Sequence, residues 1–279
     1  MTELTDNAYG KSNIHLFRVT RGASRHEVRD FTVGIRFSGA YQTAYCEGDN
    51  SHVLPTDTMK NTVYGLAKEL PSSEPEDFAL ALARHFAAGN AEAHQVRVDI
   101  AERKWDRLGD LPGHPHGFTP SGGGKHLASA TVAGTRATIE SGVSDLVLLK
   151  TTDSGFADFR KDRFTTLPET SDRILATTVE ARWSYLAEGT IDYGATWHEV
   201  NEHLRAGFTA AYSPSVQQTL WAMGKCVLDT CPAIAQIHLR LPNLHHLPVD
   251  LSPFGLEGKG EIFVATEAPF GLIEGTVRR

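Results

Sequence analysis

The predicted strands and helices of this chain occur twice in the same order, and this duplication constrains the fold more than any other feature. In each half, apolar residues alternate over two segments, follow helical spacing over two more, and alternate again over the last two. The first half is predicted to contain Asn13–Arg21, Glu27–Ser38, Thr56–Leu70, Pro75–Ala88, His94–Trp105 and Lys125–Thr138. The second half is predicted to contain Leu146–Lys150, Ile174–Tyr185, Thr196–Ala211, Ser213–Leu228, Ile234–Leu241 and Glu261–Thr266.

Two ββααββ copies predict an α+β protein with two tandem domains, residues 9–138 and 139–279. Each domain would form a four-stranded antiparallel sheet with two helices on one face. A sheet covered on one side has open edges, whose backbone groups must pair with something. We expect these edges to close into a barrel when chains associate, because closure removes every edge.

A polar loop runs directly into a helix in both halves, at Pro55–Tyr64 and at Ser213–Trp221, which match when Thr62 is set against Thr219. A helix N-terminus has unpaired N–H groups and a partial positive charge, so each segment is suited to binding an anion. Duplicated segments of this kind predict a site between two related halves.

Composition limits the classes of partner. The chain has 279 residues and a net charge of -7, which argues against a nucleic-acid or anionic-membrane surface. The start Met1–Asp6 does not resemble a signal peptide, and no stretch reaches the roughly 20 apolar residues of a membrane span. We expect a cytoplasmic protein with reduced thiols at Cys46, Cys226 and Cys231.

Metal and phosphate motifs are weak. The spacing of Cys226 and Cys231 does not match a zinc knuckle, and the turn His114–His116 lacks nearby Cys or acidic ligands at helical spacing, so no metal site is predicted. Gly122–Lys125 lacks the spacing of a phosphate-binding loop and is interpreted as a hairpin turn.

Several polar residues have both a structural and a functional interpretation. Lys11, just before the first strand, is either a solvated cation or, if buried, a proton acceptor. Thr56 and Asp57 are either an N-cap and a first-turn acid, or a hydroxyl that passes protons and a neighbour that binds a ligand. Arg173 either pairs with an acid or uses its planar fork on a flat ligand edge, with Gln217 as a complementary donor and acceptor.

The ordered set of motifs resembles the urate oxidase (uricase) family. The matching segments are Tyr9–Lys11, Thr56–Thr62, Phe164–Leu175, Ser215–Gln217 and Leu241–His245, in the family's order and spacing from about residue 9 to residue 277. The resemblance implies the tunnelling fold, a homotetramer and active sites between subunits. It implies oxidation of urate by O2 and water to 5-hydroxyisourate and H2O2, without a metal or an organic cofactor.

The resemblance also assigns roles to residues. Lys11, Thr56 and His245 would form a catalytic proton relay, and Thr56 and Asn243 would hold oxygen or water. The residues implied in substrate binding are Thr56, Asp57, Phe156, Arg173, Val216, Gln217 and Asn243. Because the family usually has an aromatic residue where His246 stands, His245 and His246 could exchange roles.

Two other functions are compatible with this fold class. A pterin enzyme would also bind a heterocycle between subunits, but those that use zinc need clustered His or Cys ligands, and an acid usually stands where Gln217 is found. A non-catalytic purine-binding protein would need Phe156, Arg173 and Gln217 but neither Lys11 nor Thr56. The presence of all five residues favours catalysis.

Overall fold

A computed structural model describes residues 2–110, 112–186, 190–258, 260–266 and 268–279. The chain divides into two compact units, Met1–Gly142 and Val143–Arg279. Both units combine helices with antiparallel strands, so the mixed α+β prediction is confirmed.

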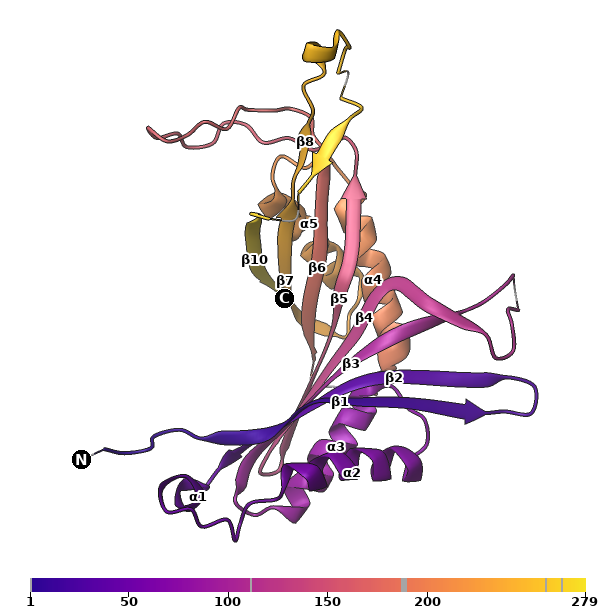
Figure 1. Cartoon of the computed structure of the whole chain (residues 1–279), viewed down its shortest axis with the longest axis vertical. Helices are drawn as coiled ribbons and strands as arrows, with labels where there is room; N and C mark the ends of the chain where they lie inside the picture. The colour runs from indigo at the N-terminus through magenta and orange to yellow at the C-terminus, as the bar shows by residue number, and fades with distance from the viewer. Residues whose placement is uncertain (1, 111, 187–189, 259, 267) are drawn as a thin grey trace. The chain divides into compact units, whose positions relative to one another are not determined.

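The first unit contains four antiparallel strands that are neighbours in chain order, as Figure 1 shows: β1 (Ala8–Arg21), β2 (His26–Gly39), β3 (Ala93–Arg107) and β4 (Phe118–Ala133). Val33 pairs with Ile100, and Val98 pairs with Ala130, which places the alternating apolar residues of adjacent strands on one face. The predicted β1–β2 hairpin is confirmed, and the strands extend beyond the predicted ends.

Three helices belong to this unit: α1 (Gln42–Cys46), α2 (Thr56–Glu69) and α3 (Pro75–Gly89). Helix α2 packs on β1, and α3 packs on β3 and β4. Met59 and Val63 of α2 and Leu82 of α3 are fully buried against the apolar face of the sheet. The amphipathic spacing that predicted α2 and α3 therefore corresponds to the core of the unit.

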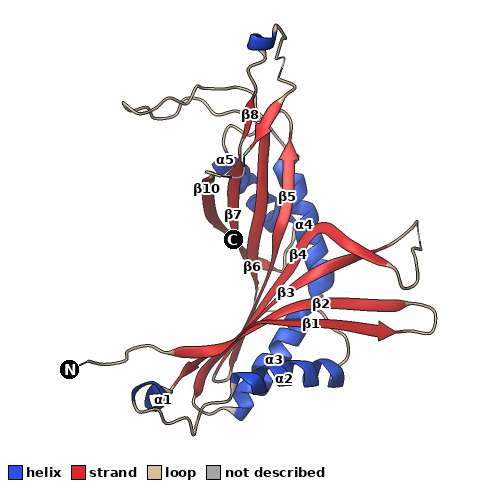
Figure 2. Ribbon diagram, viewed as in Figure 1, coloured by secondary structure: helices blue, strands red, loops and turns tan. Residues whose placement is uncertain are grey.

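The strands of the second unit follow the order β5 (Arg136–Lys150, which enters this unit at Val143), β6 (Leu175–Tyr185), β7 (Ile234–Leu244) and β10 (Gly271–Arg278). Helices α4 (Tyr193–Thr209) and α5 (Val216–Thr230) pack on each other, and α5 packs on β7 and β10. Figure 2 shows both helices on one side of these strands. Buried Trp183, Leu204 and Met223 belong to the shared core.

Two strand predictions were wrong. The segment Lys125–Thr138 is not one strand, because a turn at Gly134, whose φ of 58° is left-handed, ends β4 before β5 begins. The last strand beside β7 in the second unit is Gly271–Arg278 rather than Glu261–Thr266. Phe263–Ala265 (β9) instead pairs with His246–Pro248 (β8) in a separate two-stranded ribbon, which also carries the short 3-10 helix η1 (Ser252–Phe254).

The glycines Gly122–Gly124 do not form the predicted hairpin turn. They lie inside β4, where Lys125 pairs with Arg103 but Pro120 pairs with Trp105. The glycine-rich segment is therefore an irregularity in which β4 has extra residues relative to β3. Among the described helices, none combines the length and the apolar character needed to cross a membrane.

Candidate functional site

The predicted site residues fall into two groups, one in each unit. The Lys11 group contains Lys11, Thr56 and Asp57 of the first unit. The Arg173 group belongs to the second unit and contains Phe156, Arg173, Val216, Gln217, Asn243 and His245.

Strand β1 and the start of α2 bring the Lys11 group together. Lys11 lies on β1 at the point where its pairing with β2 becomes irregular, next to Asn13, whose φ is 56°. Tyr9, two residues earlier, accepts a hydrogen bond from the backbone N–H of Leu54 at 3.0 Å. This bond fixes the segment that enters α2 against the strand that carries Lys11.

Helix α2 begins with an uncapped N-terminus. Its N-cap is Pro55, which has no side-chain acceptor, so the prediction of Thr56 as N-cap was wrong by one residue. Thr56 is the first helical residue and is half-buried, while Asp57 is exposed. The first-turn N–H groups are consequently available to a ligand or to water.

The carboxylate of Asp57 is engaged within its own helix. It accepts hydrogen bonds from Lys60 Nζ at 2.5 Å and from Asn61 Nδ2 at 3.0 Å. The hydrogen bond and charge of Lys60 hold the pKa of Asp57 below its usual value, and the positive charge of Lys11 adds to this effect. Asp57 is therefore a carboxylate that interacts with Lys11, and its backbone N–H remains the group available for binding.

Backbone hydrogen bonds assemble the Arg173 group from distant segments. The N–H of Arg173 donates to Ser154 O at 2.7 Å, and the N–H of Gly155 donates to Ser213 O at 2.9 Å. Phe156 pairs with Thr170 in an antiparallel bridge. These contacts join the loop after β5, the residues before β6 and the entry to α5, so that Phe156, Arg173 and the α5 N-terminus lie together.

Arg173 and Phe156 form a cation–π contact. The guanidinium carbon lies 5.5 Å from the centre of the Phe156 ring, which also stacks on Phe159 at 4.8 Å. Burial lowers the pKa of Arg173, although an arginine stays protonated. A half-buried guanidinium beside an aromatic face is suited to a flat, anionic ligand.

Some of the buried polar atoms without partners belong to this group or to the residues next to it. Within the described residues, Nε of Arg173, Oγ of Ser154 and Oγ1 of Thr177 are buried without a hydrogen-bond partner. Each such atom costs about 1–3 kcal/mol when it is left unpaired. Native structures contain few of these atoms, and those at one place indicate a bound ligand or water.

The entry to α5 differs from that of α2. Ser215 is the N-cap, and its hydroxyl accepts a hydrogen bond from Gln218 N at 3.2 Å. Val216 is buried, whereas Gln217 is exposed at the first turn. The position of Gln217 leaves the oxygen and the nitrogen of its side-chain amide accessible to a ligand.

Asn243 and His245 lie at the end of β7. Asn243 pairs with Thr177 of β6 and with Gly271 of β10, so it is near the segment that carries Arg173. His245 links β7 to β8, and its carbonyl accepts a hydrogen bond from Thr266 N at 2.9 Å. Nδ1 of His246 is 3.2 Å from Leu244 O, and the choice between His245 and His246 in the relay stays a prediction.

The sequence did not assign roles to two residues that support these groups. Tyr9 positions the entry to α2, as described above. Lys150 donates to Ser213 Oγ at 2.9 Å and to Ala211 O at 3.0 Å, which fixes the entry to α5. The position of Tyr9 just before Gly10 and Lys11 is the sequence feature that could have indicated its role. No such feature marks Lys150, because its hydrogen-bond partners are 61 and 63 residues away in the sequence.

Comparison with known proteins shows the family of the chain. A sequence profile described as Uricase matches residues 7–131 and 139–274. The chain is 40% identical over 276 residues to the uricase of Arthrobacter globiformis, covering 99% of this chain and 90% of that protein. It is 37% identical over 286 residues to the uricase of Dictyostelium discoideum, covering 100% of this chain and 98% of that protein.

The crystal structure of the Arthrobacter globiformis uricase superposes with a TM-score of 0.94 at 39% identity, covering 100% of this chain and 96% of that chain. The fold is thus the α+β arrangement of antiparallel strands and few helices found in that structure. With the profile match over both units and the identity over the full length, the chain belongs to the uricase family.

Proposed function

We propose that this chain is a urate oxidase, an oxidoreductase that converts urate, O2 and water to 5-hydroxyisourate and H2O2 without a metal or an organic cofactor. Family membership supports urate as the substrate. The observation that carries the proposal is the set of buried, unpaired polar atoms around Arg173, beside the Phe156 ring. A planar anion would offset these unpaired groups and stack on the ring.

Substrate recognition would depend on the Arg173 group. Arg173 and Gln217 would bind opposite polar edges of the purine, because a guanidinium donates and an amide both donates and accepts. Phe156 would stack on the ring. The main chain of Val216 and of Asp57 would add hydrogen bonds.

Proton transfer would depend on the Lys11 group together with His245. The urate anion gives two electrons to O2, which takes up two protons and leaves as H2O2, and water adds its oxygen to the oxidised purine. The protons released by urate and water equal those taken up by oxygen. Lys11 and Thr56, assisted by His245, would move these protons, while Thr56 and Asn243 would hold O2 or water above the ring.

The assembly belongs to the same proposal. Two tandem tunnelling-fold domains per chain would associate into a homotetramer in which the Lys11 group of one chain faces the Arg173 group of another. A molecular mass near four times the 30.5 kDa of the chain, measured by light scattering, is the expected result. A stable monomer with full activity would contradict this assembly.

The activity test uses the purified protein in aerated buffer with urate and a strong chelator. We expect the urate absorbance to fall and one H2O2 to accumulate for each urate consumed. Binding of urate without turnover would support the purine-binding alternative instead, and absence of urate binding would refute the proposed function.

Two substitutions test the relay. Lys11→Met and Thr56→Ala should each lower kcat by about 100-fold or more, the usual range of acid–base catalysis, with urate affinity changed only a few-fold. Affinity is measured by equilibrium dialysis without oxygen. Lys68→Met and Thr58→Ala, at exposed positions of α2, are matched controls. Equal losses of affinity and kcat at Lys11 and Thr56 would show that neither residue transfers protons.

A further inference from the structure

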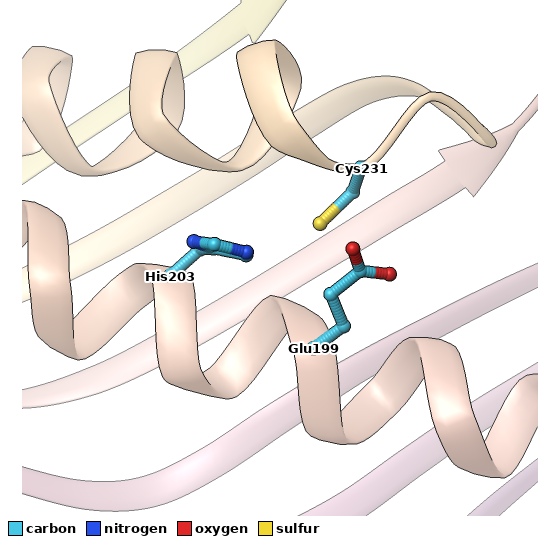
Figure 3. A group of neighbouring side chains, drawn as sticks. All are labelled: Glu199, His203 and Cys231. Atoms are coloured by element: carbon cyan, nitrogen blue, oxygen red, sulfur yellow. The ribbon is translucent and has the colours of Figure 1, made fainter.

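Three side chains of different donor types converge where α4 meets the C-terminal end of α5 (Figure 3). Glu199 and His203 are four residues apart on α4 and therefore share a face of the helix. Cys231 is the C-cap of α5. One carboxylate oxygen, one imidazole nitrogen and the thiol sulfur lie within 4.8 Å of one another.

Zinc binds each of these three donor types in proteins. Zn²⁺ binds carboxylate oxygen and imidazole nitrogen at about 2.1 Å and thiolate sulfur at about 2.3 Å, which puts neighbouring ligand atoms roughly 3.5 Å apart. The three donor atoms would therefore have to move closer together by about 1 Å to bind one ion. Glu199 is exposed and has a long side chain, so a change of its rotamer can bring its carboxylate closer to the other two donors.

The surroundings hold the other two ligands in place. Nδ1 of His203 is 4.0 Å from the sulfur of Cys226, on the facing side of α5. Arg279 donates to the carbonyls of Leu228, Cys231 and Ile234, which anchors the backbone at the C-cap.

A second cluster shows why this one is preferred. Glu74, Glu102 and His126 also converge, but Arg29 binds Glu74 at 2.6 Å and Glu102 at 2.9 Å, and Lys104 binds Glu102 at 2.8 Å. Their carboxylates are already neutralised by protein cations. No lysine or arginine of the described residues forms a salt bridge with Glu199, so its charge is available to a metal.

We propose that Glu199, His203 and Cys231 bind one Zn²⁺ ion, with water in the fourth position. The ion would link α4 to the end of α5 as a structural clip. It would lie at the opposite end of α5 from Gln217, roughly 20 Å along the helix axis. This inference does not depend on the proposed function, because it concerns a different part of the second unit.

The test titrates the full chain, freed of metal and then of chelator, with ZnSO4 under reducing conditions. We expect one equivalent of Zn²⁺ per chain and a higher melting temperature in the loaded protein. Cobalt(II) should give visible bands of tetrahedral coordination and a thiolate charge-transfer band in the near ultraviolet.

Variants assign the ligands. Glu199→Gln and His203→Gln should weaken zinc binding at least tenfold, and Cys231→Ser should also remove the charge-transfer band. His198→Gln, an exposed histidine of the same helix, and Cys46→Ser, an exposed cysteine of the other unit, should bind zinc normally.

Cys231 is buried, and its replacement can disturb folding. The decisive variants are therefore Glu199→Gln and His203→Gln, whose melting temperatures without metal should equal that of the parent. Absence of stoichiometric binding, unchanged affinity in both of these variants, or an equal loss in the His198→Gln control would overturn the proposal.

Discussion

Replacing Tyr9 by phenylalanine tests whether one hydrogen bond aligns the proposed proton relay. The Tyr9 hydroxyl accepts from Leu54 N–H, two residues before Thr56, and Tyr9 is two residues from Lys11 on the same strand. The Tyr9 ring packs edge-on against Phe37, with centroids 5.6 Å apart. Phenylalanine keeps this packing, so the substitution removes only the hydroxyl.

The expected magnitude follows from the hydrogen bond. Its net contribution is about 1 kcal/mol, rising to about 3 kcal/mol if the Leu54 N–H is left without a partner. Unfolding in denaturant should therefore show a loss of about 1–3 kcal/mol. If loosening the entry to α2 raises the activation free energy of the reaction by a similar amount, kcat should fall by about tenfold, since roughly 1.4 kcal/mol corresponds to that factor.

The control is Tyr45→Phe. The Tyr45 hydroxyl donates to Ala8 O at 2.9 Å, one residue from Tyr9, but Tyr45 lies on α1 and has no such bond to the α2 entry. We expect Tyr45→Phe to lose about 1 kcal/mol of stability or less, with kcat unchanged. The assays are urea denaturation and steady-state urate oxidation, with KM expected to stay constant in both variants. If both variants lose kcat equally, or Tyr9→Phe changes only KM, Tyr9 does not position the relay.

Two further predictions concern stability. Gly207→Ala should destabilise the second unit by about 1–3 kcal/mol, because the added methyl group would lie 2.7 Å from Met223 Cα. Gly65→Ala, at a position with open space around it, should instead stabilise α2 by up to about 1 kcal/mol. The midpoints of denaturant unfolding measure both changes. Burial alone would raise the pKa of Glu74, but the hydrogen bond with Arg29 and the positive charges of Arg29 and Lys104 together outweigh burial, so the pKa is lowered. The stabilisation by Glu74 is therefore present above its unfolded pKa of about 4.3 and is lost as pH falls toward the folded value. The Glu74→Gln variant should be less stable than the parent by about 2 kcal/mol at neutral pH, and this difference in unfolding free energy should narrow in acid. A difference that grows in acid would contradict the reasoning. Glu69→Gln, at an exposed position, is the control.

The strands that the sequence predicted well are those whose apolar residues face a core. Val33 and Ile35 of β2 and Val98 of β3 are buried, so their alternation is strong. The missed strand β10 is mostly exposed, and only Val277 is buried, so its pattern is weak. Phe263–Ala265 is more apolar yet lies in a small ribbon, because apolar character alone does not tell which strand a segment pairs with.

The turn at Gly134 was missed for a related reason. The turn between β4 and β5 is only two residues long and contains a single glycine, and hydrophobic periodicity does not register a change of direction. The sequence did not suggest the cluster for which we propose zinc binding, because Glu199 and His203 form a common helical spacing and Cys231 is distant in the sequence. Pairs of this kind become informative only when packing between helices supplies the third ligand.

The candidate binding site shows what a single chain's sequence can and cannot indicate. Arg173, Gln217 and Asn243 each have an ordinary structural interpretation, and none was convincing alone. Packing changes this balance, since the fold buries Arg173 Nε and Thr177 Oγ1 and leaves both without partners in the part of the chain that is described. Such a cost persists in a stable fold when a ligand or water offsets it. The unpaired atoms of the Arg173 group are thus the physical reason for our proposal that a polar ligand binds at this end of the second unit.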